Sequence, residues 1–130
     1  MTIALWCAAV IILLPYLLAA YGGYYRKKVF GVMEKNNPRA QAQQLEGYGA
    51  RIYAAQQNAW ENAIVFSTSV MIASVTGVEP PSAALPSVIF VLLRITHAYV
   101  YITDKPTARS IANTAGLFCC GWLIALAAMH

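Results

Sequence analysis

The chain has 130 residues, of which 59% are hydrophobic and only 11% are charged, and its mean hydropathy is +0.54. About a quarter of the residues in a soluble globular domain are charged, so this composition excludes an ordinary soluble protein and indicates an integral membrane protein. The net charge of +4 lies beside loops rather than on a water-exposed basic module, which argues against nucleic-acid binding.

Four apolar stretches, each near the roughly 20 residues that a helix needs to cross a bilayer, predict four transmembrane helices. Their predicted bounds are about 3–25, 50–77, 82–102 and 106–129, with a cytoplasmic loop at about 26–49. The first stretch has no basic segment before it and no cleavage site after it, so we interpret it as a retained helix rather than a secretion signal. Together the stretches predict a single all-α membrane domain over residues 1–130.

The first predicted helix contains Pro15 and is expected to end near Gly22 and Gly23. In the following loop, Asn37 and Pro38 indicate a turn. The polar residues 41–46 then form either a short surface helix or an irregular loop.

Basic residues set the predicted topology. The second loop, around residues 77–81, has no basic residue. The basic residues that lie in or beside the first and third loops are Arg26, Lys27, Lys28, Lys35, Arg39, Arg51, Lys105 and Arg109. The positive-inside rule therefore places the first and third loops in the cytoplasm and both termini on the other side. The three cysteines lie in apolar segments without metal-ligand spacing, so we expect neither a metal site nor a disulfide.

The second predicted helix carries five residues, four of them polar, at spacings of seven, three, one and three, which predict one shared face: Arg51, Asn58, Glu61, Asn62 and Val65. A buried carboxylate needs a partner, and Arg94 or Arg51 is the natural one for Glu61. Such a pair would either hold helices together or bind the charged groups of a zwitterionic ligand.

The third predicted helix places Arg94, His97 and Tyr101 on one face, at positions i, i+3 and i+7. Two interpretations stay open for His97, a proton-handling residue or a hydrogen-bonded packing residue. Tyr101 either donates its hydroxyl to a ligand or belongs to an aromatic belt at the membrane interface.

The fourth predicted helix begins at Pro106, a residue favoured at the first helical position, and has Arg109, Ser110 and Asn113 in its first turns. A cation there opposes the helix dipole, and a bound carboxylate or thiolate would compensate for it. The alternative is that Arg109 reaches out to lipid phosphates. Because ionisable residues at membrane depth mark functional sites, the polar faces of the last three helices predict a site in the cytoplasmic half of the membrane.

The same residues carry a family resemblance. Residues 51–66, with Arg51, Asn58 and Glu61, resemble the RxxxAxxNxxExxxxF pattern of the MAPEG family, the membrane-associated proteins of eicosanoid and glutathione metabolism. Residues 94–101 and the pair Arg109 and Ser110 resemble the family's RxxHxxxY and RS elements. The resemblance covers essentially the whole chain and points to a bacterial-type member similar to the microsomal glutathione transferases.

This resemblance implies a trimer of four-helix subunits in the bacterial inner membrane, with glutathione bound as a thiolate between subunits. It implies that Arg109 and Ser110 are catalytic and that the following residues bind glutathione: Arg26, Arg51, Asn58, Glu61, Arg94, His97 and Tyr101. The implied activity is that of a glutathione transferase or peroxidase, in which glutathione, the cosubstrate, acts without a metal on a lipophilic molecule.

Two alternatives to this activity remain at this point. The chain could resemble a non-catalytic member of the family that holds a lipid or a protein partner, or it could be a structural or channel-like oligomer. Gln56, Gln57 and Asn113 depart from eukaryotic members of the family, and Asn113 argues against prostaglandin isomerisation.

Overall fold

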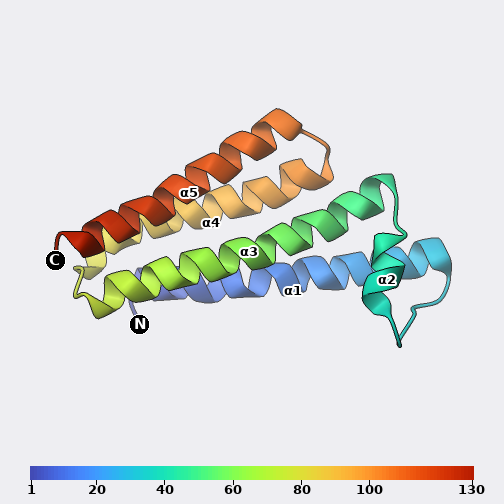
Figure 1. Ribbon diagram of the computed structural model, residues 1–130, viewed down its shortest axis with the longest axis horizontal. Helices are drawn as coiled ribbons and strands as arrows, with labels where there is room; N and C mark the ends of the chain where they lie inside the picture. Colours follow the sequence, from blue (N-terminus) through green and yellow to red (C-terminus); the bar gives the residue numbers. More distant parts are fainter.

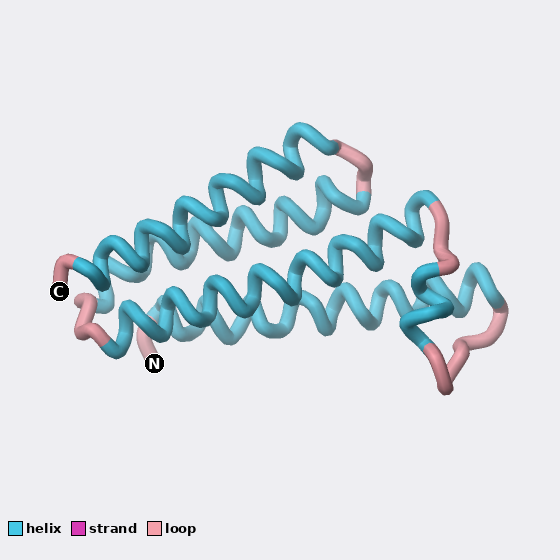
Figure 2. Tube along the Cα trace, in the orientation of Figure 1, coloured by secondary structure: helices cyan, strands magenta, loops and turns pink.

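Five helices and no strand make up the computed structural model, which describes residues 1–130. They are α1 (Ile3–Phe30), α2 (Pro38–Gln43), α3 (Gly47–Val75), α4 (Pro80–Ile102) and α5 (Pro106–Ala128). The four long helices lie side by side, and the short α2 lies at one end of them (Figures 1 and 2). The most extensive contacts join α1 to α3 and α4 to α5. These two pairs are joined in turn, because α4 contacts both α1 and α3, and α5 contacts α3.

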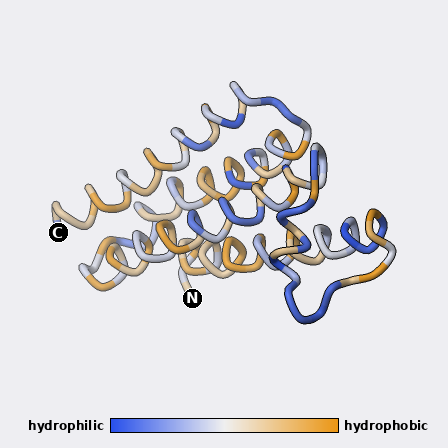
Figure 3. The backbone as a smooth tube through the Cα atoms, turned by 45° about the vertical axis from the view of Figure 1, so that its right-hand side comes forward, coloured by the Kyte–Doolittle hydropathy of each residue, from blue (hydrophilic) through white to orange (hydrophobic).

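Three of the helices, α1, α4 and α5, are long and apolar enough to cross a membrane. The fourth long helix, α3, has 29 residues, but Gln56, Gln57, Asn58 and Glu61 make its N-terminal half polar. Figure 3 shows that hydrophilic residues gather mainly at the end with α2 and the α4–α5 connection. The structure is thus that of an all-helical membrane protein, and a fourth span through α3 stays a prediction.

The end of α1 differs from the prediction. The helix continues through Gly22 and Gly23 to Phe30, and Gly31 then ends it in a left-handed conformation with φ 75°, its N–H donating to the carbonyl of Lys27. A glycine inside a helix is unfavourable by only about 1 kcal/mol relative to alanine, so the two glycines did not stop it. The basic residues 26–28 therefore belong to the end of α1, where they complement the helix dipole.

Both basic connections lie at one end of the molecule. The loop between α1 and α3, which contains α2, and the connection between α4 and α5 are at this end, whereas both termini are at the other (Figure 1). We call it the loop end. Of residues 41–46, which the sequence left undecided between a short helix and a loop, residues 41–43 form the end of α2, which begins at Pro38.

A stacked aromatic pair lies at the centre of the core. The rings of Phe66 and Phe90 are parallel within 5°, their centroids 4.0 Å apart, and both residues are 0% exposed. Small residues such as Ala63 and Gly116 let the helices approach closely around them. The pair aligns α3 with α4, so that Arg94, one turn beyond Phe90, faces the N-terminal half of α3.

Candidate functional site

A polar pocket opens between α3, α4 and α5. Its volume is about 370 Å³, and all seven of its lining residues carry polar or charged groups suited to hydrogen bonding with a ligand: Asn58, His97, Tyr101, Arg109, Ser110, Asn113 and Thr114. Tyr101 contributes an aromatic ring as well as its hydroxyl. Five of the residues predicted from the sequence, Asn58, His97, Tyr101, Arg109 and Ser110, thus line one pocket.

Arg94 lies behind this pocket and is only 2% exposed. Its guanidinium joins three helices, because it donates to Asn58 Oδ1 on α3 (2.5 Å), to His97 Nδ1 on α4 (2.9 Å) and to Asn113 Oδ1 on α5 (3.2 Å). No carboxylate pairs with it, and its Nε–H has no hydrogen-bond partner in the chain. The buried charge is therefore held by neutral acceptors.

Asn58 is fixed from a second direction. The side-chain amide of the buried Asn62, one turn further along α3, donates to Asn58 Oδ1 (3.1 Å) and to the Asn58 carbonyl (2.9 Å). Asn58 Oδ1 thus accepts from both Arg94 and Asn62. A rotation of the Asn58 side-chain amide would break its bonds with Arg94 and Asn62, so the orientation of this amide is well determined.

Arg109 lies over the ring of Tyr101, with its guanidinium carbon 4.5 Å from the ring centroid, in the geometry of a cation–π interaction. The Tyr101 ring in turn meets His97 edge-on, with centroids 5.6 Å apart. Arg109 is half-buried in the first turn of α5 and forms no ion pair. Its charge is therefore available to an anionic ligand in the pocket.

An apolar groove adjoins the polar pocket along the outer face of α5. It has a volume of about 380 Å³ and is lined by Ser110, Ile111, Thr114, Ala115 and Phe118. Ser110 and Thr114 line both hollows. A lipophilic molecule lying along α5 would therefore reach the edge of the polar pocket.

Arg51 lies outside the polar pocket. Its Nε donates to the carbonyl of Ile102 (2.9 Å), and its guanidinium forms an ion pair with Asp104 (3.8 Å). Arg51 therefore holds the connection between α4 and α5 in place, close to where α4 ends at Ile102 and α5 begins at Pro106.

Glu61 also lies outside the pocket, and the prediction that it pairs with Arg94 or Arg51 is wrong. The residue is exposed and pairs with neither Arg94 nor Arg51. Adjacent residues in a helix differ by about 100° in direction, and the packing turns Asn62 into the core. The face predicted from the sequence spacing is therefore split, with Asn62 buried and Glu61 facing outward.

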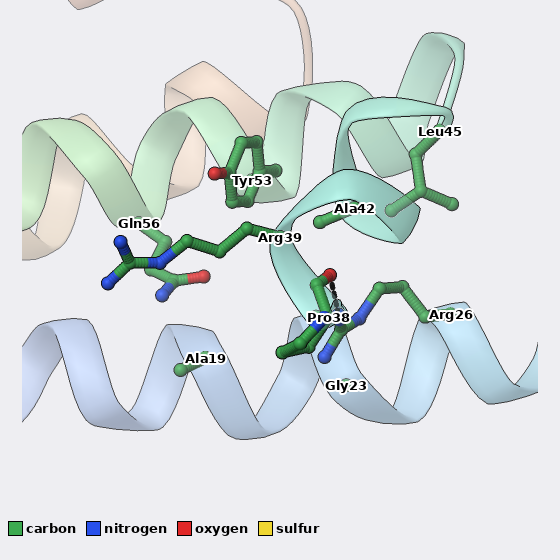
Figure 4. A pocket seen from close by; sticks show the side chains of 10 residues that line it. Ala19, Gly23, Arg26, Pro38, Arg39, Ala42, Leu45, Tyr53 and Gln56 are labelled. Atoms are coloured by element: carbon green, nitrogen blue, oxygen red, sulfur yellow. Dashed lines mark hydrogen bonds between the residues drawn. The ribbon is translucent and has the colours of Figure 1, made fainter. Parts of the chain in front are cut away.

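Arg26 lies in a second pocket, of about 180 Å³, between α1, α2 and α3 (Figure 4). Its guanidinium donates to the carbonyl of Pro38, and the side chains of Arg39, Tyr53 and Gln56 lie around the same hollow. In this chain, Arg26 is thus not part of the polar pocket.

Asn113 and Thr114 line the polar pocket but were not among the predicted site residues. Asn113 lies four residues after Arg109, which places both on one helical face, so the spacing could have revealed it. No group of three or more His, Cys, Asp or Glu side chains could hold a metal ion. The polar groups available to a ligand are amides, hydroxyls, an imidazole and a guanidinium.

Comparison with known proteins tests the resemblance seen in the sequence. The model of the MAPEG family matches residues 3–129, which is nearly the whole chain. No individual curated protein matches the chain. The resemblance is confirmed by the family match, and the chain belongs to the MAPEG family.

Proposed function

We propose that the protein is a membrane-bound glutathione transferase that also applies the same chemistry to lipid peroxides. The observation that carries this proposal is an unpaired Arg109 in a polar pocket that shares Ser110 and Thr114 with an adjoining apolar groove. A hydrophilic thiol and a lipophilic electrophile need these two environments side by side. Membership of the MAPEG family supports a function of this general kind.

Arg109 and Ser110 would hold the sulfur of glutathione. A neighbouring cation favours a thiolate over a thiol, and only the thiolate is an effective nucleophile. The thiol proton leaves for solvent when glutathione binds, the Arg109 guanidinium faces the resulting charge, and the Ser110 hydroxyl donates a hydrogen bond to it. Asn58, His97, Tyr101 and the Arg94 behind them would hold the rest of the tripeptide.

The second substrate would approach along the apolar groove of α5. The thiolate attacks an electrophilic carbon, a carbon–sulfur bond forms, and the leaving group departs with its electron pair. With a lipid hydroperoxide the thiolate instead attacks the terminal oxygen, the O–O bond breaks, and the leaving alkoxide takes a proton from solvent to become an alcohol. The resulting sulfenic acid reacts with a second glutathione to give the disulfide and water. In both reactions the protein binds the anion and admits the apolar partner.

A homotrimer with four transmembrane helices per subunit would complete this site. Glu61 is the middle residue of α3 (Gly47–Val75) and is exposed, and a carboxylate facing lipid near the bilayer centre costs about 2.5–3.5 kcal/mol or more. We therefore place the outer face of α3 against a neighbouring subunit, where Glu61 would meet the glutathione site. Arg26 of one subunit and Arg51 at the loop end would complete the set of cations near the ligand.

The same reasoning gives the proposed orientation. The loop end carries the basic residues, so we place it in the cytoplasm of a bacterium, with both termini on the other side of the inner membrane. Glutathione would then reach the site from the cytoplasm and the lipophilic substrate from the bilayer.

A second candidate function is binding of a lipid without chemistry. The apolar groove favours it, because the groove lies open along α5 with Phe118 74% exposed. The two candidates differ in whether Arg109 meets a thiolate.

Conjugation of glutathione to chlorodinitrobenzene by the detergent-solubilised protein separates these candidates. We expect Arg109→Ala to lower turnover at least tenfold, whereas Lys28→Ala, which removes an exposed cation at the same end, leaves it unchanged. Undiminished turnover in Arg109→Ala would remove Arg109 from the mechanism. Glutathione binding without turnover by the unaltered protein would favour the lipid-binding alternative.

A further inference from the structure

We propose that Arg94 is a positioning residue that makes three side chains of the polar pocket hydrogen-bond donors, so that the pocket selects an acceptor-rich anion. The starting point is the chemistry of arginine, whose guanidinium has five N–H donors and no acceptor. Every group that contacts it must therefore present an acceptor. The three groups that do so are Asn58, His97 and Asn113.

For the two asparagines this fixes the direction of the side-chain amide. Asn58 and Asn113 both turn Oδ1 toward Arg94, at 2.5 Å and 3.2 Å. The amide nitrogen, on the other arm of the same planar group, must then point away from Arg94. Since both residues line the pocket and neither nitrogen has a partner in the subunit, both NH₂ groups are free to donate to a ligand.

For His97 the same contact fixes the tautomer. Nδ1 lies 2.9 Å from Arg94 Nη2 and must carry the lone pair that accepts this bond. The proton of the neutral ring is then on Nε2, and an imidazolium, which would have N–H on both nitrogens, is incompatible with the contact. His97 also lines the pocket, so its free N–H is the third donor.

The result is a pocket whose polar lining has an excess of donors. Two amide NH₂ groups, an imidazole N–H and the Arg109 guanidinium can only donate, the hydroxyls can adapt, and no carboxylate lines the pocket. Such a site stabilises carboxylate, thiolate and carbonyl oxygen acceptors and rejects cations. That the anion is glutathione rests on the proposed function, whereas the orientation of the three donors does not.

The tautomer of His97 tests the proposal without any ligand. The chain has only two histidines, His97 and His130, and a His130→Ala variant assigns their signals in a long-range ¹H–¹⁵N correlation spectrum of the detergent-solubilised protein. We expect His97 to be neutral near pH 7 with its proton on Nε2, and Arg94→Met to shift it toward a mixture of tautomers. A proton on Nδ1, or an imidazolium, in the unaltered protein would overturn the proposal.

Asn113→Asp tests the donor role in a variant that keeps Arg94 and its acceptor. The aspartate preserves an oxygen toward Arg94 but replaces the pocket-facing NH₂ with an acceptor, so we expect glutathione to bind at least tenfold more weakly by calorimetry. Gln43→Glu, the same chemical change at an exposed position on α2, should bind as the unaltered protein does. Unchanged or tighter binding to Asn113→Asp contradicts the donor role, whereas a failure of the unaltered protein to bind glutathione contradicts the proposed function and leaves the tautomer result standing.

Discussion

Arg51 is predicted to stabilise the connection between α4 and α5 mainly through one hydrogen bond. Its Nε donates to the Ile102 carbonyl at 2.9 Å, whereas its ion pair with Asp104 is longer, at 3.8 Å, with the two side chains 30% and 70% exposed. A hydrogen bond from a charged group contributes about 1.5–3 kcal/mol, and an exposed ion pair about 0–1 kcal/mol. The carbonyl bond should therefore account for most of the effect.

We expect Arg51→Ala to lower the free energy of unfolding by about 2–3 kcal/mol and Asp104→Ala to lower it by less than about 1 kcal/mol. Asp104 has φ 60°, a conformation that glycine adopts without strain, so Asp104→Gly should be neutral or slightly stabilising. Unfolding in detergent micelles, with Lys28→Ala as a control for the loss of a cation at this end, measures these differences.

A double-mutant cycle of Arg51→Ala and Asp104→Ala decides between the two interactions. We expect a coupling energy below about 1 kcal/mol. If Asp104→Ala destabilised the protein as much as Arg51→Ala, and the double variant lost nothing more, the ion pair would be dominant and the reasoning from distance and exposure would be refuted.

Three further predictions concern packing and topology. Phe90→Ala should lower stability by about 3–5 kcal/mol because it leaves a cavity against a stacked ring, whereas Phe118→Ala, at a 74% exposed position, should change it little; equal losses would contradict the packing. Gly49→Ala should destabilise by about 1–3 kcal/mol because its Cβ would lie 2.8 Å from a tyrosine ring of α1, and Gly121→Ala, which meets nothing within 4 Å, should not. A reporter enzyme that is active only outside the cytoplasm should be active when it is fused after His130, and one that is active only inside the cytoplasm should be inactive there. The opposite pattern would reverse the proposed orientation.

Local signals in the sequence account for much of the site. Helical spacing predicts Arg94, His97 and Tyr101 on one face, and in the structure His97 and Tyr101 line the pocket with Arg94 behind them on the same helix. Pro106 marks the first residue of α5, which sets the position of Arg109. These relations depend only on the geometry of a single helix, which the order of residues determines.

The orientation of neighbouring polar residues depended on tertiary packing instead. Spacing alone could not choose between Glu61 and Asn62, and the core around Phe66 takes Asn62 inward. The partners of Arg94 are likewise set by how α5 packs on α4, which brings Asn113 within reach. A carboxylate seemed the natural partner for a buried arginine, but two amides and an imidazole fill that role.

The most direct test of the proposed function is the ultraviolet absorbance of the glutathione thiolate on binding near pH 7. The account predicts that the absorbance appears when glutathione is added to the unaltered protein and that Arg109→Ala binds glutathione without it. A thiolate signal of equal size in Arg109→Ala, or binding to the unaltered protein with no thiolate signal, would contradict the central role assigned to Arg109.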